Sequence, residues 1–204
     1  PPGTDLTELG REQAQQVADR FADAGFGAIY ASPTIRTLAT AEPLATRLGL
    51  TPIVESGIQE IWAGDDEMSP SYKTWVDYVK VVRAWWAGDF SPSTRGGEDG
   101  VAFLARWDDV VNRAAAAAAE SSVERVAFFT HGGAMRTWSF LRAQNCDPRL
   151  AEIPMPNIGT IELVGEPDNW IITAWNDQPV SPEPVDRSGL VEPGFAATRD
   201  VAGG

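Results

Sequence analysis

Residues 126–136 have the sequence VAFFTHGGAMR, in which an apolar run leads into a histidine and two glycines. The apolar run predicts a buried strand, and the glycines predict a turn that opens a helix. Such a junction directs backbone N–H groups toward anions. His131, the only histidine of the chain, is therefore a candidate for holding an oxyanion or a phosphoryl group. The alternative is a core histidine whose ring is satisfied by a neighbour.

Composition limits the kind of protein that this chain can be. Its 204 residues suffice for one domain with a full core, and no apolar stretch approaches membrane-spanning length. The net charge of -13 disfavours nucleic acid and membrane surfaces as partners, so any phosphate site must be a local basic patch. Cys146 is the only cysteine, which excludes an intramolecular disulfide and fits a reducing, cytoplasmic compartment. We expect neither a metal nor another cofactor, because one histidine and one cysteine make a poor metal site.

Helices alternate with strands along the chain. Hydrophobic periodicity predicts helices over residues 7–24, 32–48, 71–87, 100–121 and 132–145, and strands over 26–31, 126–131, 160–164 and 170–175. Ser32 and Pro33 are expected to be the N-cap and first-turn proline of the second helix, and Pro43 predicts a kink in it. The last two strands predict a hairpin. This alternation predicts an α/β sandwich with a mixed sheet.

Residues 53–95 are less regular and contain four of the eight tryptophans. Residues 58–62 fit either a short strand or a loop. Trp75, Val79, Val82 and Trp86 form a stripe at helical spacing. We expect most of this segment to pack as a lid, with one or two rings facing a pocket.

Six patches, in order between residues 6 and 176, resemble motifs of one enzyme family. They are LTELGREQA at 6–14, YASPTIRTLATAEPL at 30–44, IQE at 58–60 with Gly64, GGE at 96–98, THGGAMR at 130–136, and PN at 156–157 before a strand. Each match is weak by itself, whereas all six in sequence are specific. Together they resemble the histidine phosphatase superfamily, the phosphoglycerate mutase-like group.

The resemblance implies a three-layer α/β/α sandwich with a mostly parallel mixed sheet over residues 1–178, with residues 61–95 as the lid. Residues 179–204, rich in proline and glycine, are expected to form an extended or disordered tail. The resemblance also implies phosphoryl transfer through a phosphohistidine on a small phosphorylated substrate. In the family, a histidine of an N-terminal RHG motif attacks phosphorus, and an acidic residue protonates the leaving oxygen.

Three side chains carry the implied chemistry. His131 corresponds to the family's second histidine, and a protonated imidazole suits the charge on the transferring oxygens. Arg36 matches the phosphate-clamping arginine, because a guanidinium offers a planar fork of donors; the alternative is a solvated first-turn residue. Glu60 matches the general acid, and its apolar neighbours Ile58, Ile61 and Trp62 would partly desolvate it and raise its pKa. The alternative for Glu60 is an ordinary surface glutamate.

Three further residues are candidates for the same site. Gly132 would offer its backbone N–H to phosphate, and the role of a plain turn glycine is compatible with this. Trp62 and Asn157 are candidates for lining the pocket, although a turn-forming role accounts equally well for Asn157.

The sequence departs from the family because it has no RHG motif and no second histidine. The strand that should carry this motif is a central one, so its loss would leave unpaired backbone groups on residues 26–31 or 126–130. We therefore expect that the chain is incomplete and that the nucleophile lies outside it; the first residue, Pro1, fits this expectation.

Phosphomonoester hydrolysis is the favoured function. A mutase must retain a doubly phosphorylated intermediate, which calls for a richer basic rim than residues 61–95 provide. The alternatives are mutase-type phosphoryl transfer, a pseudoenzyme that binds inorganic phosphate or a phosphorylated ligand without turnover, and a structural protein with His131 in its core.

Overall fold

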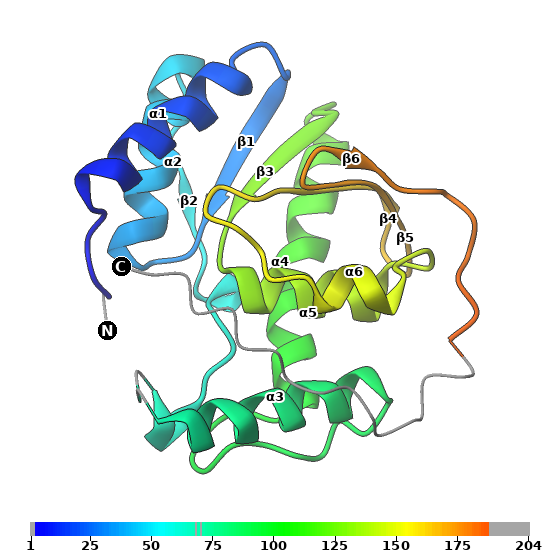
Figure 1. The fold of residues 1–204 in the computed structure, drawn as a ribbon. Helices are drawn as coiled ribbons and strands as arrows, with labels where there is room; N and C mark the ends of the chain where they lie inside the picture. Colours follow the sequence, from blue (N-terminus) through cyan, green and yellow to red (C-terminus); the bar gives the residue numbers. More distant parts are fainter. Residues whose placement is uncertain (1–2, 68, 70, 188–204) are drawn as a thin grey trace.

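The computed structural model describes residues 3–67, 69 and 71–187 (Figure 1). Its helices are α1 (Glu8–Arg20), α2 (Ile35–Leu48), α3 (Tyr72–Trp86), α4 (Gly100–Glu120), α5 (Gly132–Arg142) and α6 (Pro148–Glu152), with 3-10 turns η1 (Ser56–Ile58) and η2 (Gly64–Asp66). Its strands are β1 (Phe26–Ala31), β2 (Ile53–Val54), β3 (Arg125–Phe129), β4 (Ile161–Glu166), β5 (Asn169–Trp175) and β6 (Gln178–Pro179).

A parallel sheet, ordered β2-β1-β3, lies between two layers of helices. Because side chains alternate along a strand, Ile29 and Ala31 pack with α1 and α2, whereas Tyr30 packs with α4 on the opposite face. Figure 1 shows α1 and α2 on one side of β1 and β3. The α/β class and the three-layer arrangement predicted from the sequence are therefore confirmed.

The remaining strands form a second sheet, ordered β4-β5-β6 and antiparallel. Its β4–β5 pair is the predicted hairpin. The strands expected in one mixed sheet are thus divided between two sheets. In the part of the chain that the structure describes, β3 pairs with β1 alone and no strand joins it to the second sheet.

Local capping explains several helix boundaries. The hydroxyl of Thr7 accepts the Gly10 N–H at 3.1 Å and starts α1, as predicted, although α1 ends at Arg20 and residues 21–24 form a turn. The helix α2 ends at Gly49, whose φ of 67° is a left-handed conformation that glycine adopts without strain. Pro43 lies inside α2, and its kink stays a prediction.

The expected start of α2 is wrong. The N-cap is Thr34 rather than Ser32, and the helix begins at Ile35. The hydroxyl of Thr37 donates to the carbonyl oxygens of Ser32 and Thr34, at 2.7 and 2.9 Å, and holds this turn. Ser32 itself is fully buried and hydrogen-bonds to a residue far away in sequence instead of capping the helix.

The helix α3 matches its predicted range, with Ser71 and Ala87 as its caps. Its predicted buried stripe is partly wrong, since Trp75 is 43% exposed and the buried tryptophan is Trp85. The ring of Trp85 stacks on Phe103 of α4, with centroids 5.5 Å apart, and packing against α4 therefore decides which face of α3 is buried. Residues 59–63 form a loop rather than a strand.

Residues 179–187, the described part of the predicted tail, are anchored to the domain. After β6 the chain has no further helix or strand up to residue 187, yet Arg187 donates to the carbonyl oxygens of Phe140 and Ala143 at the end of α5. Residues 188–204 lie outside the described residues. Within the described residues, no helix combines the length and the apolar character that crossing a membrane requires.

Candidate functional site

His131 is the N-cap of α5, at the point where β3 ends. Its ring is 6% exposed and touches two residues that lie almost 100 positions earlier in the chain. Nε2 lies 2.8 Å from the hydroxyl oxygen of Ser32, and Nδ1 lies 3.0 Å from Nη2 of Arg36. Arg36 is the second residue of α2, so the carboxyl ends of β1 and β3 bring both side chains together.

These contacts determine the protonation state of His131. A guanidinium can only donate hydrogen bonds, so Nδ1 must be the acceptor for Arg36 and the proton of the neutral ring lies on Nε2, facing Ser32. Burial, followed by the positive charges of Arg36 and Arg106, lowers the pKa of His131 to about 4. At neutral pH this environment favours the neutral imidazole.

Glu60 lies beside the same helix N-terminus. Its Oε2 accepts the N–H of Gly133 at 3.1 Å, and its Oε1 accepts the N–H of Ile61 at 2.9 Å. Burial raises its pKa, while these backbone donors and the charge of Arg136 act in the opposite direction. The net shift is upward, which is the direction that a proton donor needs.

A buried ion pair holds the loop that carries Glu60. The guanidinium of Arg106, on α4, makes five hydrogen bonds: two to the carboxylate of Glu98 and three to the carbonyl oxygens of Gly57, Gln59 and Glu60. Glu98 is 8% exposed and Arg106 is 22% exposed. The sequence analysis quoted Glu98 within a motif without a role, and nothing in the local pattern around Arg106 indicated this contact.

The other predicted residues occupy less central positions. Gly132 is the first residue of α5, directly after His131, and Gly133 is the glycine whose N–H binds Glu60. Trp62 is 60% exposed on the loop after Glu60. Asn157 is an exposed turn residue, in a turn closed by the Gly159 N–H on Pro156 O at 3.0 Å, which supports its turn-forming role.

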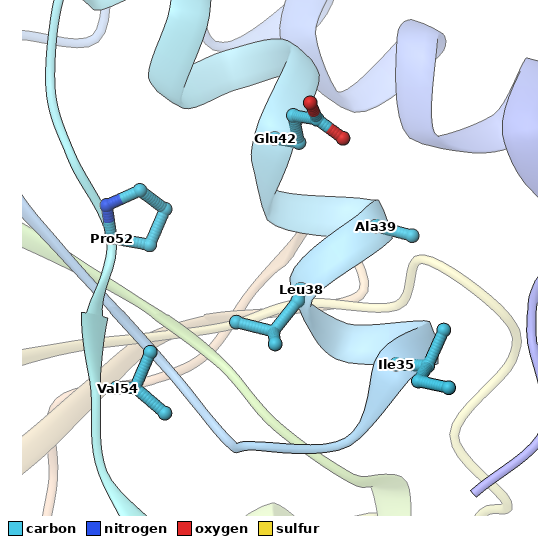
Figure 2. Close-up of a pocket in the computed structure, with 6 residues that line it drawn as sticks. All are labelled: Ile35, Leu38, Ala39, Glu42, Pro52 and Val54. Atoms are coloured by element: carbon cyan, nitrogen blue, oxygen red, sulfur yellow. The ribbon is translucent and has the colours of Figure 1, made fainter. Parts of the chain in front are cut away.

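A shallow apolar groove lies on another part of the surface, between α2 and β2 (Figure 2). Figure 2 shows Leu38 directed toward Pro52 and Val54 across this groove. Its lining residues are Ile35, Leu38, Ala39, Glu42, Pro52 and Val54, and they include none of the predicted site residues. Among the residues described, no cluster of three or more histidine, cysteine or acidic side chains is arranged to hold a metal ion.

Solved structures with a similar fold include a phosphatase and a mutase. A mycobacterial glucosyl-3-phosphoglycerate phosphatase, solved with inorganic phosphate, superposes with a TM-score of 0.69 at 25% identity, covering 86% of this chain and 88% of that one. A phosphoglycerate mutase from Bacillus anthracis has the same fold, with a TM-score of 0.67 at 18% identity over 85% of this chain and 82% of that one.

A curated relative is PE-PGRS family protein PE_PGRS11 of Mycobacterium tuberculosis (strain ATCC 25618 / H37Rv), which is 32% identical over 199 residues. The match covers 89% of this chain but only 33% of that protein, so the chain spans about a third of this relative's length. The model of the histidine phosphatase superfamily (branch 1) matches residues 1–178. On this match, together with the shared fold, the chain belongs to the histidine phosphatase superfamily.

Proposed function

We propose that this chain is the major part of a phosphatase that hydrolyses phosphate monoesters of small molecules through a phosphohistidine. The observation that carries the proposal is the convergence of the Arg36 guanidinium, the His131 imidazole and the Glu60 carboxyl group at the N-terminus of α5. Two of these groups suit phosphoryl oxygens, and the third suits the leaving oxygen. The buried thiol of Cys146 fits the cytoplasmic location that we propose.

The attacking nitrogen comes, in this proposal, from a histidine outside these 204 residues, because His131 is the only one they contain. Attack on phosphorus breaks the bond to the leaving oxygen, and Glu60 gives its proton to that oxygen. Water then attacks the phosphohistidine, passes a proton to the Glu60 carboxylate, and releases phosphate. The β3 edge without a hydrogen-bonded neighbour among the described residues supports the addition of another strand there.

Arg36 and His131 change partners when the dianion binds. In the free site Arg36 donates to the imidazole, whereas a phosphoryl group between them accepts from both. The negative charge also favours the protonated imidazole, so anion binding raises the pKa of His131 from about 4. Gly132, one residue later, directs its backbone N–H into the same region at the helix N-terminus.

Anion binding to this chain tests the proposal without requiring turnover. Titration calorimetry with inorganic phosphate and vanadate is expected to give a dissociation constant that rises at least about tenfold in Arg36→Met and in His131→Gln, because each removes one charged donor to the anion. Arg113→Met, which removes an exposed arginine elsewhere on α4, serves as the control. Equal affinity in all four proteins would overturn the site assignment.

Turnover separates the phosphatase from a binding protein. A longer protein that contains the nucleophilic histidine is expected to hydrolyse an aryl phosphate and to form an acid-labile phosphoprotein in rapid-quench experiments. In this protein, Glu60→Gln should slow esters with poor leaving groups much more than esters with good ones. Phosphate binding without any turnover would instead support the pseudoenzyme alternative.

A further inference from the structure

Tyr78, in the middle of the lid helix α3, belongs to none of the motifs that the sequence analysis recognised. Its hydroxyl group nevertheless lies beside the proposed proton donor. A Cβ atom built on Gly133 would come within 2.8 Å of both Oη of Tyr78 and Oε1 of Glu60. The two oxygens therefore border the same small volume, which stays open because Gly133 has no side chain.

The ring of Tyr78 is held in place by the core. It packs against the buried cluster that includes Ile61 and Ala134, which are the sequence neighbours of Glu60 and Gly133. Figure 1 shows α3, which carries Tyr78, below α5. The hydroxyl end of this partly buried side chain therefore occupies space beside the Glu60 carboxyl group.

Charged and titratable groups surround Glu60 from the three helices α3, α4 and α5. From α5, Arg136 faces it, with its guanidinium fixed on the carbonyl oxygens of Gly132, Ala151 and Ile153. From α4, Arg106 donates to its backbone carbonyl oxygen. From α3, Tyr78 contributes a neutral hydroxyl, because burial raises the pKa of that phenol.

We propose that Tyr78 is a positioning residue that covers the Glu60 carboxyl group from the lid helix and keeps water away from it. This inference rests on the proposed role of Glu60 as proton donor. Water stabilises a carboxylate more than a carboxyl group, so the cover lets Glu60 keep its proton until the leaving oxygen takes it.

Direct titration of Glu60 in this chain tests the inference. Carbon-13 NMR of protein labelled at the glutamate carboxyl carbons follows each pKa, and Glu60→Gln identifies the resonance of Glu60 by its loss. We expect Tyr78→Ala to lower the Glu60 pKa by about one unit, since water then reaches the carboxylate. Tyr78→Phe keeps the ring and is expected to keep the wild-type pKa.

Tyr72→Phe is the matched control, because Tyr72 lies on the same helix and is 52% exposed. It is expected to leave the Glu60 titration unchanged. If Tyr78→Ala does not fold, Tyr78→Leu leaves a smaller gap, and its Glu60 pKa should lie between those of wild type and a solvated glutamate. A wild-type Glu60 pKa in a folded Tyr78→Ala or Tyr78→Leu protein would overturn the inference.

Turnover by the longer protein distinguishes this inference from the proposed function. Tyr78→Ala is expected to move the alkaline limb of the pH–rate profile to lower pH and to slow poor leaving groups selectively, both of which Tyr78→Phe restores. If the Glu60 titration is unchanged in an active Tyr78→Ala enzyme, the role of Tyr78 is refuted, whereas the proposed function is not. If Tyr78→Ala lowers the Glu60 pKa but the longer wild-type protein shows no turnover, the role of Tyr78 is supported and the proposed phosphatase function is refuted.

Discussion

Acidification is expected to destabilise this protein through its only histidine. Burial and the charges of Arg36 and Arg106 lower the pKa of His131 from 6.5 to about 4 in the folded state. In the unfolded chain the imidazole titrates near its ordinary value. Below that value the unfolded state binds a proton that the folded state does not, so the free energy of unfolding falls as the pH falls. This contribution is fully present above the unfolded pKa and is lost on the way down to the folded pKa.

The two pKa values set the magnitude of this effect. The lost stability is about 2 kcal/mol at pH 5 and approaches about 3 kcal/mol below pH 4. A loss of this size is a large share of the stability of an ordinary domain. It exceeds what an exposed histidine would contribute, because an exposed ring has the same pKa in both states.

Two measurements check this prediction. The free energy of unfolding in urea at pH 7, 6 and 5 is compared between wild type and His131→Gln, which has no titratable ring. Carboxylates, including Glu60 with its raised pKa, titrate in both proteins, so their contributions cancel in the difference. Proton NMR gives the pKa directly, since a chain with one histidine has one imidazole Cε1–H resonance. The reasoning is refuted if both proteins lose the same stability between pH 7 and pH 5, or if that resonance titrates near pH 6.5.

Three substitutions and one control variant test the rest of the site. Arg36→Met is expected to raise the pKa of the His131 imidazole toward its ordinary value, because it removes an adjacent positive charge. The same proton NMR resonance measures this pKa. An unchanged titration midpoint would contradict the contact between Arg36 and His131. Arg106→Met leaves the buried Glu98 carboxylate without its partner and should cost about 3–5 kcal/mol of unfolding free energy in urea. Arg113→Met, which breaks a half-exposed pair, should cost no more than about 1 kcal/mol, and equal losses would refute the comparison. Gly133→Ala puts a methyl group 2.8 Å from Oε1 of Glu60, the proposed proton donor. Turnover of esters with poor leaving groups by the longer protein should therefore fall about tenfold or more. An unchanged rate would show that the carboxyl group tolerates being displaced by the methyl group.

The sequence predicted correctly those helices and strands that are determined by residues close together in the chain. The strand at residues 26–31, the lid helix over residues 72–86 and the helix over residues 100–120 lie where hydrophobic periodicity and capping residues placed them. Two other helices, α1 and α5, end several residues before the predicted ends. Periodicity marks which face packs, whereas the last turn depends on neighbouring elements that the local sequence does not describe.

The errors have long-range causes. Ser32 precedes a proline and a helix, which is the local pattern of an N-cap. Its hydroxyl group instead forms a hydrogen bond with His131, 99 residues later. Trp85 and Trp86 are adjacent and chemically equal, and only the position of Phe103 on α4 decides that Trp85 is the fully buried ring. A local pattern does not distinguish these alternatives, because the partner lies far along the chain.

By itself, the sequence determined the family, the α/β class and the identities of the candidate groups His131, Arg36 and Glu60, because each belongs to a short motif. Only the tertiary structure decided that the three meet at one helix N-terminus, that the free imidazole is neutral, and that Arg106 and Glu98 hold the Glu60 loop. Hydrogen bonding and desolvation act through distances in space. Those distances arise when β1, β3 and α4 pack together, and motif spacing along the chain does not contain them.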